Sequence, residues 1–96
     1  MLLPMKATEP FRPRVLVVDD DAELCQLLSQ YLSDEGYDVE AVHDGVMGVG
    51  RALSGDHAMV VLDVMLPGIK GFEVLRRVRA HSNVPVLMLL LPLNAP

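Results

Sequence analysis

Aspartates stand directly after two short apolar runs of this chain. The runs are residues 15–18 and 59–62, and the aspartates are Asp19, Asp20, Asp21 and Asp63. Apolar runs of this length are typical of buried strands in a parallel sheet. Because open α/β sheets bind ligands beyond the carboxyl ends of their strands, two neighbouring strands would gather these carboxylates at one edge. Close carboxylates repel one another unless a cation neutralises them, and oxygen ligands suit Mg²⁺. The sequence therefore predicts a magnesium-dependent acidic site.

Residue patterns place these runs among alternating strands and helices. We expect strands at residues 14–18, 37–42, 59–62 and 86–90, and helices at residues 21–35, at residues 46–53 and from Gly71 onward. Asp21 is expected to cap the first helix and Gly36 to end it. This helix has one apolar stripe, formed by Leu24, Leu27, Leu28, Tyr31 and Leu32. The alternation implies an α/β fold, a doubly wound parallel sheet with right-handed crossovers and helices on both faces.

Length, composition and charge narrow the class of protein. The 96 residues have room for one domain, and a hydrophobic content of 51% is enough for a core. A net charge of −5 argues against nucleic-acid binding by this chain. The single cysteine, Cys25, excludes an internal disulfide and fits a reducing compartment. No apolar stretch reaches the about 18 residues of a membrane span, and the start lacks a signal pattern. We therefore expect a cytoplasmic domain that binds no membrane.

Two motifs of the chain resemble the receiver domain of bacterial two-component response regulators. They are residues 15–21, Val-Leu-Val-Val-Asp-Asp-Asp, and residues 62–68, Leu-Asp-Val-Met-Leu-Pro-Gly, followed by Gly71, Phe72 and Glu73. Residues 84–89 also resemble the fourth strand of that family, so the resemblance covers residues 14–89. It is strongest to the subgroup that carries a winged-helix DNA-binding domain. The resemblance implies a flavodoxin-like receiver fold with strand order 2-1-3-4-5.

The resemblance also implies a role for each residue of the acidic site. Asp63 would be the phosphoacceptor, whose carboxylate attacks the phosphoryl group of a kinase phosphohistidine. Asp19 and Asp20 would bind Mg²⁺ together with Asp63, and the backbone carbonyl of Met65 would be a further ligand. Phosphoryl transfer needs positioning and charge neutralisation, which such a site supplies. The implied partner is a sensor histidine kinase that docks largely on the helix at residues 21–35. The chain would not be an enzyme beyond its own phosphorylation on Asp63.

The chain departs from the receiver pattern after the fourth strand. Where the family has a serine or threonine whose hydroxyl binds the phosphoryl group, this chain has Leu90. At the next position, where the family has a small residue, this chain has Leu91. A leucine side chain cannot donate a hydrogen bond. The family's fifth strand, its lysine and its last two helices have no counterpart in the sequence. We therefore expect a C-terminally truncated receiver, with a flexible leader at residues 1–13, a partial receiver domain at residues 14–91 and a non-matching tail at residues 92–96.

Two alternatives to a working phosphoacceptor module stay open. One is a remnant that keeps the acidic metal site but does not signal. The other is an interaction module that binds a kinase without turnover or pairs with a second copy of itself. Without a fifth strand, residues 86–91 would form an apolar edge strand, and exposed strands of this kind pair with other chains.

Several residues that could do chemistry have simpler explanations. We interpret Asp21 as a helix cap rather than a metal ligand. Cys25 is expected to be an inert helix cysteine, because it lies between the acidic helix cap and the apolar stripe. The three histidines, His43, His57 and His81, lack the spacing of metal ligands, and we expect them on the solvated surface.

Overall fold

A computed structural model describes residues 11–90, and within them strands and helices alternate strictly. The elements are β1 (Arg14–Val18), α1 (Ala22–Asp34), β2 (Asp38–Val42), α2 (Gly45–Ala52), β3 (Met59–Asp63), α3 (Gly71–Arg79) and β4 (Val86–Leu89). Every predicted element is present, and no predicted end differs from the observed one by more than one residue. Most of the predicted leader, all of the predicted tail and Leu91 lie outside the described residues.

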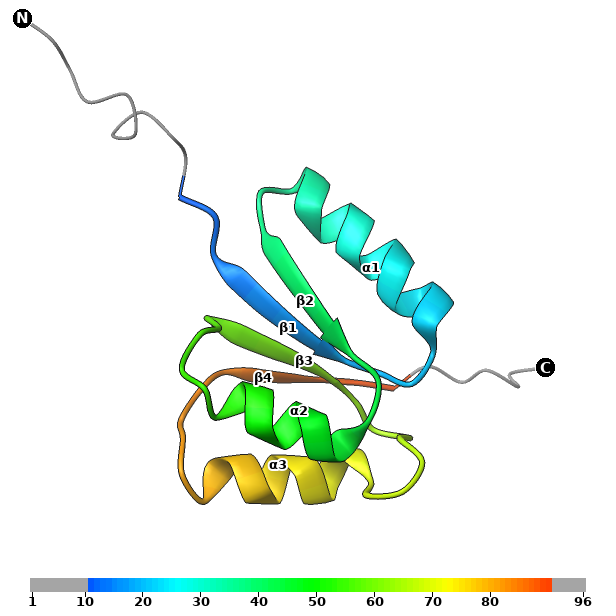
Figure 1. Cartoon of the computed structure of the whole chain (residues 1–96), viewed down its shortest axis with the longest axis vertical. Coiled ribbons are helices and arrows are strands. Elements are labelled where there is room, and N and C mark those ends of the chain that lie inside the picture. The colour runs from blue at the N-terminus through cyan, green and yellow to red at the C-terminus, as the bar shows by residue number, and fades with distance from the viewer. Residues whose placement is uncertain (1–10, 91–96) are drawn as a thin grey trace, which may run out of the picture.

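The four strands form one parallel sheet in the order β2-β1-β3-β4 (Figure 1). The predicted fold class is confirmed, and the order matches the first four positions that the resemblance implies. Val18 at the end of β1 pairs with Leu62 of β3, one residue before Asp63. On the other side of β3, Asp63 pairs with Leu89 of β4. The acidic ends of β1 and β3 therefore lie side by side at the carboxyl edge of the sheet.

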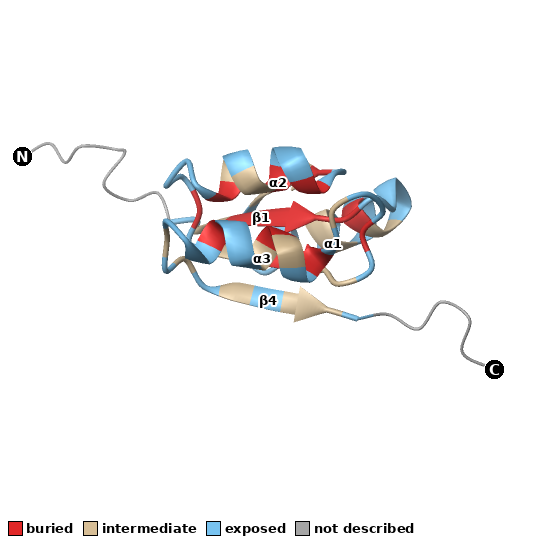
Figure 2. Cartoon of the chain, turned by 90° about the horizontal axis from the view of Figure 1, so that it is seen from below, coloured by how far each residue is buried: buried red, intermediate tan, exposed pale blue. Residues whose placement is uncertain are grey.

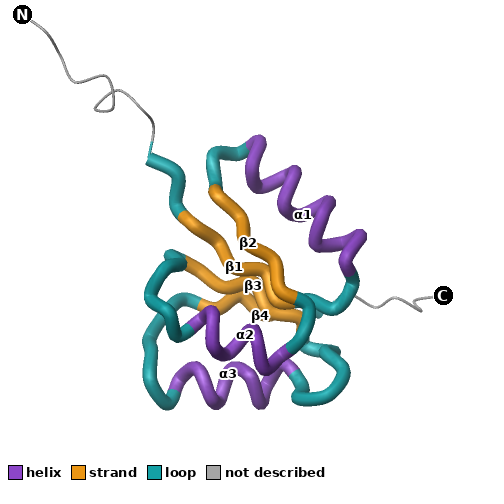
Figure 3. Tube along the Cα trace, viewed as in Figure 1, coloured by secondary structure: helices purple, strands orange, loops and turns teal. Residues whose placement is uncertain are grey.

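Helices cover both faces of the sheet, α1 on one face and α2 with α3 on the other (Figure 3). Side chains alternate along a strand, so each strand contributes to both layers. The core under α2 and α3 contains Leu16, Val18, Val60, Leu62, Leu66, Val74 and Val78. The core under α1 contains Val15, Val17, Val61 and Cys25. Burial of these apolar side chains stabilises the strand ends that carry the aspartates.

The short helix α2 packs closely on β1 because it contains small residues. A Cβ atom at Gly48 would lie only 2.7 Å from Cγ1 of Val18. Glycine costs a helix about 1 kcal/mol relative to alanine, and here this loss is offset by the close contact with the strand. The side chain of Asp44 accepts a hydrogen bond from the Met47 amide at 2.8 Å and caps the start of α2.

Helix α1 buries a narrower face than its apolar stripe indicates. Leu27 and Tyr31, which belong to the predicted stripe, are 67% and 63% exposed. Cys25, outside the predicted stripe, is buried instead. Asp21 caps the helix as predicted, because its side chain accepts a hydrogen bond from the Leu24 amide at 3.1 Å. Among the described residues, no helix has the length and apolarity needed to cross a bilayer.

Candidate acidic site

Three carboxylates meet at the carboxyl edge of the sheet. Asp19 and Asp20 follow β1 and Asp63 ends β3, and one carboxylate oxygen from each lies within 4.8 Å of the other two. Asp19 is buried, Asp63 is half-buried and Asp20 is exposed, so the cluster is open to solvent on one side. The structure therefore brings together the three aspartates that the sequence predicts as a site. An all-carboxylate cluster of this size suits a hard divalent cation.

Asp19 is the most constrained of the three, with only 4% of its surface exposed. Its backbone N–H donates to the Val42 carbonyl at 3.1 Å, and its Oδ1 accepts from the Asp21 amide at 2.9 Å. Burial raises the pKa of Asp19, and the nearby charges of Asp63 and Asp20 raise it further, whereas the hydrogen bond from Asp21 opposes this effect. A bound cation would relieve both the desolvation and the repulsion.

Asp63 has one oxygen engaged and one open. Its Oδ1 accepts a hydrogen bond from the Met65 amide at 2.8 Å, and its Oδ2 has no hydrogen bond within residues 11–90. The next residue, Val64, donates its N–H to the Leu89 carbonyl at 3.0 Å and so ties the loop to the end of β4. These contacts orient the carboxylate and, among the described residues, leave Oδ2 without a hydrogen bond. The carbonyl of Met65 as a metal ligand stays a prediction.

Gly71 allows α3 to begin directly against the Asp63 backbone. A Cβ atom at this position would collide with the Asp63 carbonyl oxygen and would lie 2.8 Å from the Cα of Val64. The Gly71 N–H also donates to the Val64 carbonyl at 3.2 Å. The loop after β3 is therefore closed by a contact that only glycine permits. Sequence reasoning used Gly71 as a helix start and as part of a motif, but it missed this packing role.

The model of the response regulator receiver domain family matches residues 15–90. The chain belongs to this family. A transcriptional regulatory protein of Haemophilus influenzae, the CpxR homolog, is 46% identical over 79% of this chain and 33% of its own length. The expected subgroup of transcriptional regulators is confirmed by such relatives. The chain spans about a third of the length of the curated relatives it matches.

Solved receiver structures share the fold. The chemotaxis response regulator CheY4 of Vibrio cholerae has a TM-score of 0.76 and 34% identity, over 81% of this chain and 68% of that one. The receiver domain of the sensor histidine kinase PA1611 of Pseudomonas aeruginosa has a TM-score of 0.76 and 27% identity, over 81% of this chain and 66% of that one. A magnesium ion is coordinated in the active-site cleft of that receiver.

Two further side chains of this receiver domain contact the Asp19 backbone. The Nδ1 atom of His43 lies 3.0 Å from the Asp19 carbonyl oxygen, and because a carbonyl only accepts, Nδ1 is the donor. The Sγ atom of Cys25 lies 3.4 Å from the same oxygen. Burial raises the pKa of the Cys25 thiol to about 11, and the neighbouring Asp19 adds to this, so the thiol keeps its proton. Sequence reasoning missed His43, although its place directly after β2 puts it at the same edge of the sheet.

The expectation of solvated histidines is wrong for His57. Its side chain is fully buried, and Nε2 donates to Oε1 of Glu40 at 2.9 Å. Glu40 also accepts two hydrogen bonds from Arg51, at 2.7 and 2.9 Å, and forms an ion pair with Arg14 at 3.3 Å. The hydrogen bonds from Arg51, with a smaller contribution from His57, lower the pKa of Glu40 to about 2. This network connects β1, β2 and α2 and takes no part in the acidic cluster.

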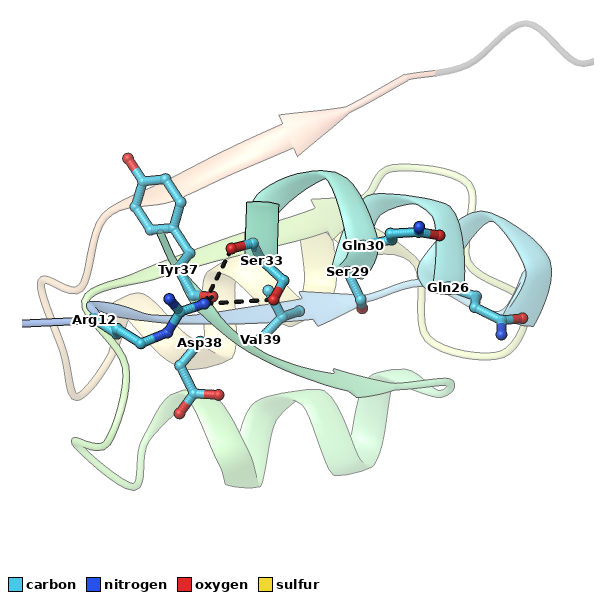
Figure 4. Close-up of a pocket in the computed structure, with 8 residues that line it drawn as sticks. All are labelled: Arg12, Gln26, Ser29, Gln30, Ser33, Tyr37, Asp38 and Val39. Carbon is cyan, nitrogen blue, oxygen red and sulfur yellow. Dashed lines mark hydrogen bonds between the residues drawn. The ribbon is translucent and has the colours of Figure 1, made fainter. Parts of the chain in front are cut away.

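A polar hollow of about 410 Å³ lies between α1 and β2 (Figure 4). It is lined by Arg12, Gln26, Ser29, Gln30, Ser33, Tyr37, Asp38 and Val39. Nη2 of Arg12 donates to the backbone carbonyls of Ser33 and Tyr37, each at 3.0 Å. None of the predicted site residues lies in this hollow. Arg12, which the sequence places in the leader, thus ties the chain before β1 to the end of α1.

Proposed function

We propose that Asp63 of this receiver domain accepts a phosphoryl group from the phosphohistidine of a sensor histidine kinase, with Mg²⁺ held by the acidic cluster. The observation that carries the proposal is the approach of Asp19, Asp20 and Asp63 to within 4.8 Å in a member of the receiver family. The magnesium ion in the receiver of PA1611 supports the choice of cation. The proposed ligands are these three carboxylates and the backbone carbonyl of Met65.

In the proposed reaction an Asp63 oxygen bonds to phosphorus while the phosphorus–nitrogen bond of the phosphohistidine breaks. The electron pair of that bond goes to the imidazole nitrogen, and the product on this chain is an acyl phosphate. Since Oδ1 accepts from the Met65 amide, Oδ2 is the oxygen that attacks. Asp19 and Asp20 would hold the cation together with Asp63. Bound Mg²⁺ supplies charge neutralisation between the carboxylates and the phosphoryl oxygens.

The proposed docking surface for the kinase is α1. Its exposed apolar side chains, Leu27 and Tyr31, are one helical turn apart and lie on a helix that starts at the acidic edge. Exposed aromatic and aliphatic residues of this kind are common in protein interfaces. The buried free thiol of Cys25 fits a reducing compartment, and we propose that the chain acts in the cytoplasm.

A mass measurement tests the phosphoacceptor. The chain is incubated with acetyl phosphate and Mg²⁺, and its intact mass should rise by one phosphoryl group. Asp63→Asn removes the nucleophile and should abolish the gain, while Asp34→Asn, an exposed change in α1, should leave it intact. A gain that persists in Asp63→Asn would show that another residue is the acceptor.

A second function, Mg²⁺ binding without signalling, is favoured by one feature of the chain. Leu90 stands where the family resemblance places a hydroxyl residue, directly after the residue that pairs with Asp63. Leu90 is 64% exposed and has no side-chain donor for a phosphoryl oxygen. Calorimetric titration with Mg²⁺, combined with the mass measurement, separates the two functions. Mg²⁺ binding without any gain in mass would support the second function and contradict the first.

A further inference from the structure

His43 contacts the acidic cluster without being one of its carboxylates. Its ring Nδ1–H donates to the backbone carbonyl of Asp19 at 3.0 Å. We propose that His43 is a positioning residue, which holds the Asp19 backbone and thereby keeps Asp19 and Asp20 where they meet Asp63. The predicted effect on Mg²⁺ affinity rests on the proposed function, whereas the contact and its effect on the backbone do not.

Asp19 lies one residue beyond the last residue of β1 that pairs with β2. The last paired residues of β1 and β2 are Val18 and Val42, and the Asp19 N–H still donates to the Val42 carbonyl. Within residues 11–90, no backbone N–H is hydrogen-bonded to the Asp19 carbonyl. Its two donors are the side chains of His43 and Cys25. The Asp19 N–H is therefore held by the β2 backbone, whereas the Asp19 carbonyl, where the chain turns toward Asp20, is held by side chains.

Such a tether matters because the carboxylates repel one another. Asp19, Asp20 and Asp63 have oxygens within 4.8 Å of each other, and among the described residues no hydrogen bond joins one of these carboxylates to another. His43 is the first residue after β2, so its hydrogen bond joins the end of β2 to the end of β1. A fixed arrangement lowers the cost of ordering the ligands when a cation binds.

Of the two donors, His43 is the stronger and the more easily replaced. An imidazole N–H at 3.0 Å is within the normal range for a hydrogen bond, whereas a thiol at 3.4 Å is a weak donor. The side chain of Cys25 is buried in the core under α1, so its replacement would also disturb packing. His43 is exposed and belongs to neither core, so its replacement should disturb packing less, although its Nδ1 atom also lies 3.8 Å from the Sγ atom of Cys25.

Four variants of the full chain test the proposal. In His43→Asn the amide nitrogen can take the place of Nδ1, whereas in His43→Gln it lies one carbon further out and in His43→Ala it is missing. We expect Mg²⁺ affinity, measured by calorimetry, to fall about tenfold in His43→Gln and His43→Ala, the lower end for residues that orient metal ligands. His43→Asn should keep the affinity of the wild type. His81→Ala, which changes an exposed histidine at the far end of α3, should also keep it.

Nuclear magnetic resonance gives a readout that needs neither metal nor phosphorylation. The neutral ring of His43 should carry its proton on Nδ1, and the backbone amide signals of Asp20 and Asp21 should shift in His43→Ala but not in His43→Asn. A proton on Nε2, or equal shifts in the Asn and Ala variants, would overturn the proposal. If the wild type gains no phosphoryl group while these signals behave as expected, the proposed function fails and the role of His43 stands.

Discussion

Asp20 is the most exposed member of a cluster in which three like charges meet. Removing its charge should relieve repulsion with Asp19 and Asp63, because no cation compensates for it in metal-free buffer. We expect Asp20→Asn to raise the free energy of unfolding by about 0.5–1 kcal/mol without metal, since nearby surface charges interact on this scale. With Mg²⁺ present the wild type should be more stable than Asp20→Asn, because Mg²⁺ binding stabilises the folded wild type and the variant has partly lost this binding.

Thermal unfolding with and without Mg²⁺ measures this difference. Glu23→Gln is the control, because it removes an exposed charge in the first turn of α1 outside the cluster. Its response to Mg²⁺ should equal that of the wild type. An Asp20→Asn variant that is less stable than the wild type in metal-free buffer would contradict the repulsion argument.

At the residue scale, the sequence predicted the carboxylates but not the groups around them. An aspartate after a buried run is placed by the strand, so the meeting of Asp19, Asp20 and Asp63 could be predicted once two strands were neighbours. His43 and His57 could not be placed in this way. A single histidine carries no periodic signal, and its partners, the Asp19 carbonyl and Glu40, come from other strands that only the fold brings near.

Gly71 determines how closely the start of α3 approaches the end of β3. Gly71→Ala would place a methyl group against the Asp63 carbonyl, so we expect a loss of about 1–3 kcal/mol, the usual cost of overpacking. The shifted loop should also weaken Mg²⁺ binding. Gly50→Ala in α2 is the matched control: nothing lies within 4 Å of its added carbon, so it should stabilise the chain by up to about 1 kcal/mol. Urea unfolding compares the two, and equal effects would refute the steric argument.

The network around Glu40 should make stability depend on pH. Hydrogen bonds from Arg51 lower the pKa of Glu40 from 4.5 to about 2. A carboxyl group with a lowered pKa in the fold stabilises it above the unfolded pKa, and this contribution is lost as pH falls through the folded pKa. The contribution should therefore be complete above about pH 5, be lost progressively towards pH 2, and amount to about 2 kcal/mol after allowance for solvent screening.

Two matched variants test this pH dependence. Glu40→Gln should flatten the fall in stability between about pH 5 and pH 2, the range over which such a group titrates. Glu73 also has a pKa of about 2, because of Arg76 and Arg77, but these pairs lie on the surface of α3. Water and salt screen exposed pairs, so Glu73→Gln should change the acid midpoint far less. Equal effects of both variants would show that burial of the network is unimportant.

At the element scale, alternation of strands and helices predicted all seven elements, because runs of apolar residues and helix caps are local signals. The face that α1 buries was less predictable. Helical spacing gives the same signal for every apolar residue of the stripe. Which of these residues are buried depends on where α1 lies on the sheet. Leu27 and Tyr31 are left exposed for that reason.

For the molecule as a whole, the sheet is covered unevenly. Helix α1 packs mainly on β2, and within the described residues only β3 pairs with β4. Figure 2 contrasts the buried strand β1 with β4, which is half-buried and has one exposed residue. That residue is Leu87, which is 55% exposed on the face of the sheet that α1 covers elsewhere. An apolar strand at the margin of a sheet can pair with another chain.

We therefore expect this 96-residue chain to self-associate through β4. Sedimentation velocity over a range of protein concentrations should show a species that grows with concentration. Leu87→Lys places a charge on the edge strand, a common protection against strand pairing, and should shift the chain towards monomer. Val46→Lys is the control, because Val46 is similarly exposed, at 66%, but lies on α2. If both variants reduced association equally, general solubility and not the edge strand would be the cause, and a monomeric wild type at every concentration would exclude pairing through β4.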